Sequence, residues 1–174
     1  MADIALAGLL AVTTSRESAF ATFYQRNIAS LTRTLTASLG DHQLAQEAAQ
    51  ESMARACERW EKIQGYDNPT GWCYRVAMNW ATSRWRKRRR EIITDELPPP
   101  ARLVDELDIG IQDRVLEALR GLSLEHRSVI VLRLIEDWSI TQTATALGIA
   151  EGTVQSRYAR ALQKLRVELG DIHD

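Results

Sequence analysis

The feature that most constrains the fold of this chain is the spacing of its apolar residues, which recur at three- and four-residue steps along most of its length. The first clear series ends at Gly40 and comprises Phe20, Phe23, Tyr24, Ile28, Leu31, Leu35 and Leu39. Such spacing places side chains on one face of an α-helix. No segment shows the alternation of apolar and polar residues that is typical of a half-buried strand. The pattern predicts an all-α protein.

Two more helices are expected before residue 91, and each has a start signal. Asp41 is a suitable N-cap for a helix with Leu44, Ala48, Ala49, Met53 and Trp60 on its inward side. Asn68 and Pro69 suit the N-cap and first helical position of a helix that ends near Arg90. Its apolar stripe consists of Trp72, Cys73, Val76, Ala77 and Trp80. Residues 1–90 are therefore expected to form a compact helical domain.

Residues 91–108 break the helical pattern. Three consecutive prolines, 98–100, cannot continue a helix and favour extended backbone. The segment carries six acidic residues and one basic residue, whereas residues 1–90 carry 13 basic and eight acidic residues. This segregation predicts two domains joined by a flexible acidic linker, with the first domain facing an anion. A solvated spacer and an active acidic segment both remain open for the linker.

Residues 109–174 predict a second helical domain, and it contains a helix-turn-helix. Apolar spacing indicates one helix that closes near Gly121, and Ser123 is a candidate N-cap for the next. From Ser139 onward the sequence indicates a helix, a tight turn and a second helix. The turn falls at Gly148. The spacing of Ala144, Gly148 and Val154 is typical of a helix-turn-helix.

The second helix of this motif carries side chains that suit DNA on the side opposite its apolar stripe. The stripe consists of Val154, Tyr158, Ala161, Leu162 and Leu165. The opposite side consists of Gln155, Ser156, Ala159, Arg160 and Gln163, with Arg157 at its flank. Gln, Ser and Arg bond to base edges or phosphates, and the amides of Gly152 and Thr153 suit a phosphate. An ordinary surface helix of a bundle is the alternative interpretation.

Several function classes are disfavoured by composition and spacing. No apolar run reaches the roughly 18–20 residues that a membrane span needs, and the apolar N-terminal stretch lacks the basic flank of a signal peptide. Cys57 and Cys73 are expected to be buried free thiols, which indicates a reducing, cytoplasmic compartment. His42, His126 and His173 are scattered, and no phosphate loop or metal-ligand spacing is present. We therefore expect no enzymatic activity, cofactor or metal.

Three longer segments carry a family resemblance. They are "GDHQLAQEAAQESMARACERW", "NPTGWCYRVAMNWATSRWRKRRR" and "LSLEHRSVIVLRLIEDWSITQTATALGIAEGTVQSRYARALQKLR". In this order they resemble the polymerase-binding helix, the promoter −10 segment and the −35-binding domain of extracytoplasmic-function (group IV) sigma factors of bacterial RNA polymerase. The likeness covers residues 18–90 and 111–167. It implies a factor that docks on core RNA polymerase, directs it to promoter DNA and helps to open the duplex, often under the control of an anti-sigma factor.

Candidate residues for three surfaces follow from the resemblance and the local chemistry. Opening DNA requires a pocket for an unstacked base, and the −10 candidates are Gly65, Tyr66, Asp67, Asn68, Asn79, Ser83, Arg84, Trp85, Arg86, Lys87 and Arg88. The −35 candidates are Gly152, Thr153, Gln155, Ser156, Arg157, Ala159, Arg160 and Gln163. The polymerase-binding candidates are Gln46, Glu47, Gln50, Glu51, Arg55 and Glu58. Core packing is expected for Trp80, whereas for Trp85 packing and base stacking are balanced.

The chain departs from the family pattern at two positions and resembles it in the linker. Glu47 stands where the family often has Asp, which keeps a carboxylate. Gln155 stands where a basic residue is frequent, which leaves the −35 sequence open. Acidic linkers in the family thread the RNA exit path of the polymerase, a role that the resemblance implies for Asp95, Glu96, Asp105, Glu106 and Asp108. A helix-turn-helix regulator that works without polymerase is the alternative function.

The segment "SRWRKRRRE" (83–91) concentrates six basic side chains. It continues the preceding apolar stripe without a helix breaker and is therefore expected to form the last turns of a helix. Cations there suit the negative end of the helix dipole, but six exceed that need. The run predicts salt-sensitive binding of DNA phosphates beside the site where the duplex opens.

Overall fold

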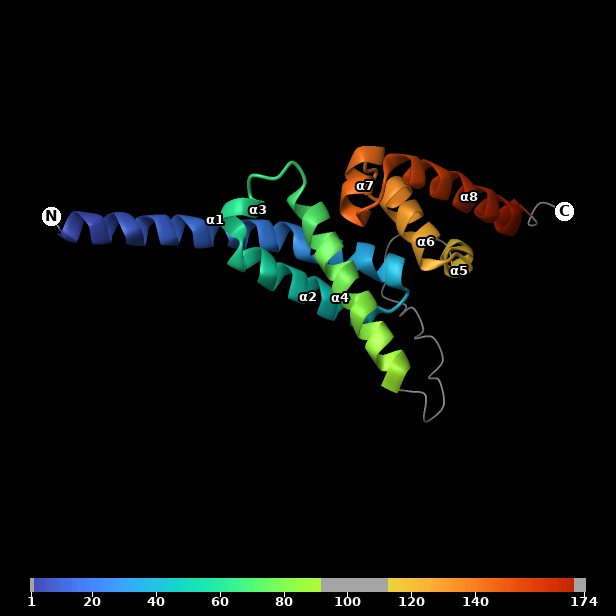
Figure 1. Cartoon of the computed structure of the whole chain (residues 1–174), viewed down its shortest axis with the longest axis horizontal. Helices are drawn as coiled ribbons and strands as arrows, with labels where there is room; N and C mark the ends of the chain where they lie inside the picture. Colours follow the sequence, from blue (N-terminus) through green and yellow to red (C-terminus); the bar gives the residue numbers. More distant parts are fainter. Residues whose placement is uncertain (1, 92–112, 171–174) are drawn as a thin grey trace.

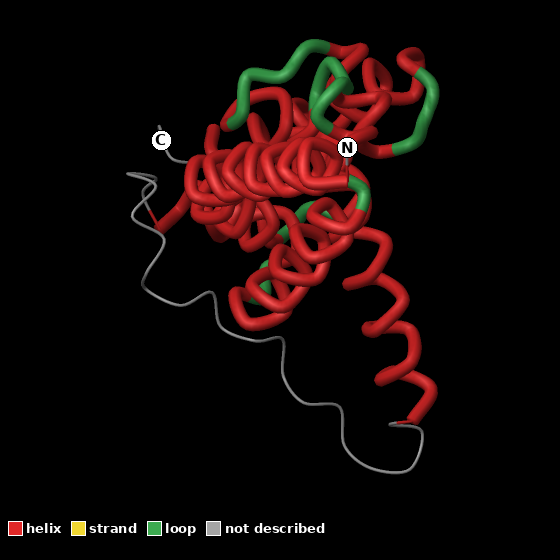
Figure 2. The backbone as a smooth tube through the Cα atoms, turned by 90° about the vertical axis from the view of Figure 1, so that its left-hand side faces the viewer, coloured by secondary structure: helices red, strands yellow, loops and turns green. Residues whose placement is uncertain are grey.

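The computed structural model describes residues 2–91 and 113–170, which form helices joined by short loops and no strands (Figures 1 and 2). The first domain contains α1 (Ala2–Leu39), α2 (His42–Glu58), α3 (Trp60–Ile63) and α4 (Pro69–Glu91). The second contains α5 (Asp113–Arg120), α6 (Leu124–Ile130), the π-helix η2 (Val131–Ile135), α7 (Ile140–Leu147) and α8 (Glu151–Gly170). The predicted all-α class, with two helical domains and a helix-turn-helix, is confirmed. Most of the expected linker, from residue 92 onward, lies outside the described residues.

Helix α1 is longer than the apolar spacing predicted. The N-terminal stretch is continuous with the rest of α1, and its blue end extends beyond the other helices in Figure 1. No proline interrupts residues 2–39, so the helical hydrogen bonds continue unbroken. The helix ends as predicted at Gly40, which has a φ of 74° and donates its amide to Thr36 O at 2.8 Å.

The predicted N-caps of α2 and α4 are confirmed. Asp41 Oδ1 accepts the amide of Leu44 at 2.9 Å, and Asn68 Oδ1 accepts the amide of Gly71 at 2.7 Å. The second helix is shorter than expected, because α2 ends at Glu58 and a single turn, α3, follows it. Trp60 begins that turn and is buried against Phe20 and Phe23, with ring centroids 5.5 and 4.7 Å away.

The core of the first domain lies where α1, α2 and α4 meet. Fully buried side chains include Leu31, Leu35, Met53, Tyr74 and Ala77. Small alanines on α2 and α4 bring these helices close together.

The prediction for the two cysteines is half wrong. Both are free and Cys73 is buried, but Cys57 is exposed. Cys57 follows the last inward residue of α2, Ala56, and one step along a helix turns a side chain about 100° away from the core.

The helix expected after Ser123 in the second domain contains a π-helical segment. Helix α6 gives way after Ile130 to η2, and Glu136 donates its amide to Val131 O at 3.1 Å. Asp137, with a φ of 51°, follows and ends the helical run. Ser123 occupies the N-cap position of α6, but its hydroxyl contacts His126 Nδ1 at 2.9 Å and caps no backbone amide.

The helix-turn-helix begins after Ser139 and turns at Gly148, as predicted. Ser139 and Gln142 form a capping box, in which Ser139 Oγ accepts the amide of Gln142 at 3.1 Å and Gln142 Oε1 accepts the amide of Ser139 at 2.9 Å. Gly148 ends α7 with a φ of 66°. Thr141 donates its hydroxyl to Glu151 Oε1 at 2.7 Å and so joins α7 to the start of α8.

The two domains are packed against each other. Helix α4 contacts α7, and α1 contacts α6 and η2 (Figure 1). Leu132 of η2 and Ala146 of α7 are both buried in the core of the first domain. In the described residues, no helix is both long and apolar enough to cross a membrane.

Candidate nucleic-acid interface

The loop between α3 and α4 lines a cavity of about 570 Å³. Gly65, Tyr66 and Asp67 are exposed there, and Asn68 is half-buried because its oxygen caps α4. Trp72 and Arg75 of α4 form the next part of the wall. An aromatic ring, a carboxylate and a guanidinium beside one cavity suit a planar base with polar edges.

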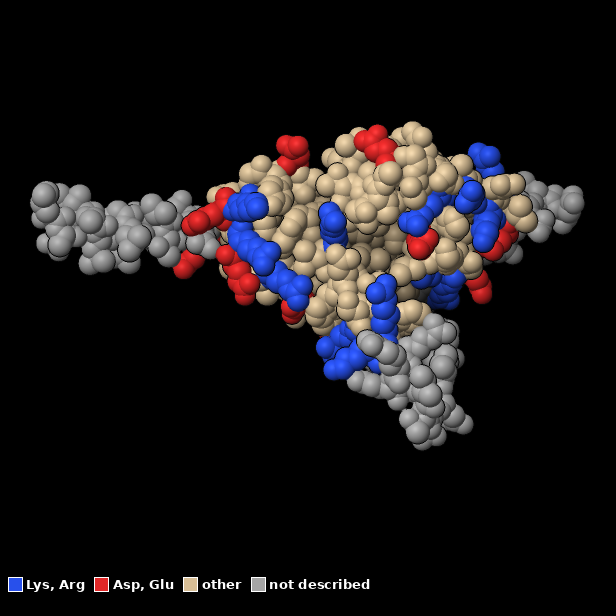
Figure 3. Space-filling view, in the orientation of Figure 1, with Lys and Arg blue, Asp and Glu red and all other residues tan. Residues whose placement is uncertain are grey.

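The last turns of α4 carry the basic run on an unbroken helix, as predicted. Ser83, Arg84, Trp85, Arg86 and Lys87 are exposed, and the side chain of Arg88 lies outside those described. Blue Lys and Arg side chains gather at this end of α4 in Figure 3. The helix thus presents several cations together, an arrangement that suits a phosphate backbone.

Two tryptophans on α4 have different surroundings. Trp80 is half-buried against the core, as expected, and its ring lies 5.0 Å from the guanidinium carbon of Arg84. Arg84 also pairs with Glu47 of α2, with Nε 3.5 Å from Oε2. Trp85 has 55% of its surface exposed, the largest value for an aromatic ring in the described part of the chain. Its exposure is what base stacking requires.

Asn79 is exposed one turn before the basic run. It lines a second cavity, of about 160 Å³, together with Met78 and Thr82 of α4. The far wall comes from the second domain and includes Glu125 and Arg157. No periodicity in the sequence indicated this juxtaposition.

Helix α8 presents the polar side that the sequence predicted. Val154, Ala161 and Leu165 are buried, and the exposed residues are Gly152, Gln155, Ser156, Ala159, Arg160 and Gln163, with Thr153 half-buried. Arg157 lies apart from them, because its guanidinium pairs with Glu125 Oε2 at 2.8 Å and its side chain is only 25% exposed. The exposed side of α8 can thus enter a groove without Arg157.

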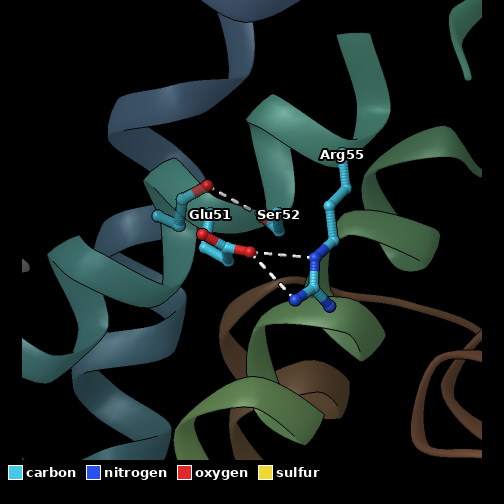
Figure 4. A network of polar contacts seen from close by, with 4 residues as sticks. Glu51, Ser52 and Arg55 are labelled. Atoms are coloured by element: carbon cyan, nitrogen blue, oxygen red, sulfur yellow. Dashed lines mark hydrogen bonds and ion pairs between the residues drawn. The ribbon is translucent and has the colours of Figure 1, made fainter. Parts of the chain in front are cut away.

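The polar side of α2 lies opposite its buried alanines. Gln46, Gln50, Arg55 and Glu58 are exposed, whereas Glu47 and Glu51 are half-buried. Glu51 Oε1 accepts two hydrogen bonds from Arg55, from Nε and Nη2, both at 2.9 Å (Figure 4). In the same view, Ser52 turns inward and donates to Ala49 O at 2.8 Å. Within residues 2–91 and 113–170, no three His, Cys, Asp or Glu side chains are grouped so as to hold a metal ion.

Comparison with known proteins identifies the family to which the chain belongs. A family model described as Sigma-70 region 2 matches residues 23–91, and one described as Sigma-70, region 4 matches residues 112–165. The RNA polymerase sigma-E factor of Streptomyces antibioticus is 39% identical over 126 residues, which cover 72% of this chain and 70% of that protein. The chain belongs to the extracytoplasmic-function sigma factors.

Further relatives agree with this assignment. The ECF RNA polymerase sigma factor SigL of Mycobacterium tuberculosis is 36% identical over 156 residues, which cover 86% of this chain and 88% of that protein. The sigma factor RpoE of Bartonella quintana, solved with the anti-sigma factor NepR, has a TM-score of 0.77 at 24% identity over 87% of this chain and 96% of that one. CnrH, solved with the cytosolic domain of CnrY, has a TM-score of 0.60 at 22% identity over 91% of each chain. These two structures share the fold.

As a sigma factor, the protein directs core RNA polymerase to promoter DNA for the initiation of transcription. The alternative of a helix-turn-helix regulator that works without polymerase is not favoured, because both sigma regions match in family order.

Proposed function

We propose that the two domains divide promoter recognition between them. Residues 1–90 bind core polymerase and open the −10 element, residues 91–108 act as a linker, and residues 109–174 bind the −35 element. The observation that carries this proposal is the order of groups along α4: an exposed loop precedes its first residue, Asn79 is exposed on its middle turns, and the basic run forms its last turns. One helix thereby carries groups that suit phosphates and groups that suit a base edge.

At the −10 element, the cations of α4 bind the phosphate backbone of the DNA strand. Neighbouring residues of the same domain specify the base sequence. Arg84, Arg86 and Lys87 bind phosphates, which releases counterions and makes the affinity depend on salt. An unstacked base enters the cavity beside Tyr66 and Asp67, and Asn79 bonds to a base edge. Trp85 stacks on an exposed base.

Replacing Asn79 with Ala tests this reading of the −10 element. We expect promoter opening to fall by roughly 5- to 150-fold, the effect of one lost base contact of about 1–3 kcal/mol, while affinity for core polymerase is unchanged. Permanganate reactivity of unpaired thymines measures opening, and a holoenzyme titration measures affinity. Thr82→Ala, one turn away, is the control. Equal opening by wild type and the Asn79→Ala protein would contradict the proposal.

At the −35 element, the exposed side of α8 lies in the major groove. Gln155 and Arg160 read base edges, Ser156 and Gln163 contact bases or phosphates, and the amides of Gly152 and Thr153 face a phosphate. Gln155 stands where the family often has a basic residue, so Arg160 is the main candidate for a guanine contact.

Replacing Arg160 with Ala is expected to weaken holoenzyme binding to the −35 element by about 1–3 kcal/mol and to relax the preference at one base pair. Lys164→Ala removes an exposed cation one turn further along α8 and serves as the control, since a phosphate contact weakens all sequences alike. Binding to a set of single-base −35 variants measures both effects. If the Arg160→Ala protein loses the same affinity for every −35 variant, Arg160 contacts a phosphate and not a base.

The polar side of α2 is proposed to bind core polymerase through Gln46, Glu47, Gln50, Glu51, Arg55 and Glu58. The ion pair between Glu51 and Arg55 fixes two of these side chains in one geometry. We further propose that the chain acts in the cytoplasm without catalysis or a cofactor. An anti-sigma factor is a proposed partner, since RpoE and CnrH were each solved with a protein partner, an anti-sigma factor for RpoE and a cytosolic domain of CnrY for CnrH.

A further inference from the structure

Glu151 belongs to the exposed side of α8, the side that is proposed to read the −35 element. It is the first residue of that helix, and its side chain is exposed. Gln155 and Ala159 follow it at steps of four residues, and side chains at this spacing lie one above the other on one side of a helix. Glu151, Gln155 and Ala159 therefore form one row along α8, with the carboxylate at its start.

The start of this row is open to a bound molecule. Gly152 is exposed, and no other part of the described chain lies within 4 Å of the place where a Cβ on it would stand. Residues in the first turn of a recognition helix contact base edges when the helix lies in the major groove. The family match to Sigma-70, region 4 covers residues 112–165 and so includes Glu151. The carboxylate thus stands where a base edge can reach it.

The other helix of the helix-turn-helix orients this carboxylate. Thr141 of α7 donates its hydroxyl to Glu151 Oε1 at 2.7 Å. The threonine side chain is itself stiff, because two heavy atoms on its Cβ restrict its rotation. The carboxylate keeps acceptor capacity after this bond, since its two oxygens offer about four acceptor positions. Glu151 is therefore an exposed acceptor that loses little rotamer freedom when it bonds to DNA.

The chemistry of a carboxylate decides which group of DNA it can contact. Phosphates are repelled, because both groups are negatively charged. In the major groove, guanine presents two acceptors, N7 and O6, and thymine presents the acceptor O4 beside a methyl group. Adenine offers its N6 amino group, but the acceptor N7 lies next to it. Cytosine alone offers an amino group, N4, without an acceptor of its own beside it.

We propose that Glu151 selects cytosine at one position of the −35 element by accepting a hydrogen bond from the N4 amino group, and that Thr141 positions the carboxylate for this contact. The cytosine lies at the end of the element that receives the first turn of α8. This role of Glu151 rests on the proposed binding of α8 to the −35 element, and it adds a residue and the base that this residue reads.

Binding of holoenzyme to a complete set of single-base −35 variants tests this role. The starting promoter is taken from polymerase-dependent start sites. Wild type is expected to prefer cytosine at one base pair by roughly five- to thirtyfold, a usual effect of one mismatched pair. Glu151→Ala is expected to lose this preference and to keep the preferences at the other base pairs. Glu151→Gln is expected to prefer adenine there, because a glutamine amide pairs with adenine N6 and N7.

Glu168→Gln is the matched control for charge. It makes the same chemical change on α8, but near the other end of the helix, where Glu168 lies beside Gly121. Removal of either carboxylate raises the affinity for all DNA sequences alike, since it removes repulsion of phosphates. Only the Glu151 variants are expected to change the order of preference among the four bases.

The positioning role of Thr141 is tested on the same set of promoters. Thr141→Val keeps the shape of the side chain and removes its hydroxyl. It is expected to reduce the cytosine preference roughly two- to fivefold, the effect of one hydrogen bond, and to leave the other base pairs unchanged. Thr141→Ser restores the donor and is expected to restore the preference. A merely structural role would weaken binding to all sequences and leave the cytosine preference intact.

A base analogue tests the contact at the level of one amino group. 2-Pyrimidinone has the shape of cytosine but carries hydrogen in place of the N4 amino group. At the preferred position it is expected to weaken binding by wild-type holoenzyme roughly five- to thirtyfold more than binding by the Glu151→Ala holoenzyme. Equal losses for the two proteins would show that Glu151 does not bond to the amino group.

An unchanged order of base preference in both Glu151 variants would overturn the role of Glu151, as would an equal change in affinity for every promoter. Arg160→Ala separates this failure from a failure of the −35 assignment. If Arg160→Ala relaxes the preference at its own base pair while both Glu151 variants keep the wild-type order, α8 reads the −35 element without Glu151. If wild type shows no preference at any −35 base pair, α8 does not read the element and the role of Glu151 falls with it.

Discussion

A Leu132→Ala protein is expected to unfold with about 2–5 kcal/mol less free energy than wild type, the usual cost of deleting a large buried side chain. Leu132 belongs to the second domain, yet its side chain is 0% exposed in the core of the first. The substitution leaves a cavity where the second domain packs against the core of the first. Urea denaturation followed by circular dichroism measures the loss.

Leu134→Ala is the matched control for this experiment. It makes the same chemical change two residues further along η2, where the side chain is 52% exposed. We expect a change of no more than about 0.5 kcal/mol for it. Equal losses for the two variants would show that Leu132 is not buried between the domains.

Replacing Arg84, Arg86 and Lys87 together with Ala is expected to make promoter binding by holoenzyme much less sensitive to salt. Each phosphate contact contributes about 0.7–0.9 to the slope of log affinity against log salt concentration, so three contacts contribute roughly two to three. Affinity is expected to fall more than tenfold at physiological salt. The slope is obtained from binding titrations at four or more salt concentrations on one promoter.

The control for the basic run is a protein with Arg26, Arg59 and Lys62 replaced by Ala. These cations are also exposed in the first domain, but they lie on α1, between α2 and α3, and on α3, not on α4. Their loss changes the net charge equally and is expected to leave most of the slope in place. An equal decrease of slope for both triple variants would assign the effect to overall charge and not to α4.

Local features of the structure could be predicted because their causes lie within a few residues. Asp41 and Asn68 cap helices with their own side chains, and Gly40 and Gly148 end helices with positive φ. These interactions depend on neighbours in sequence and leave a pattern there. The helix-turn-helix and the helical state of the basic run were predictable for the same reason.

Features that depend on distant parts of the chain could not be predicted. Leu132 and Ala146 fit the apolar stripes of their own helices, and nothing in their spacing tells that the first domain covers them. Arg127 has the sequence surroundings of a solvated cation, although it caps α1 from the other domain. Cys57 is exposed because it lies one residue beyond the last inward position of α2. Such outcomes are set by how whole helices pack, which periodicity does not encode.

The central claim is that this chain gives core RNA polymerase its promoter specificity. Run-off transcription with purified bacterial core polymerase on a genomic library of promoter fragments tests it most directly. We expect a small set of start sites that require both the polymerase and this protein and that share −10 and −35 sequences. Start sites that do not depend on this protein, or tight specific binding of duplex DNA by the protein without polymerase, would contradict the claim.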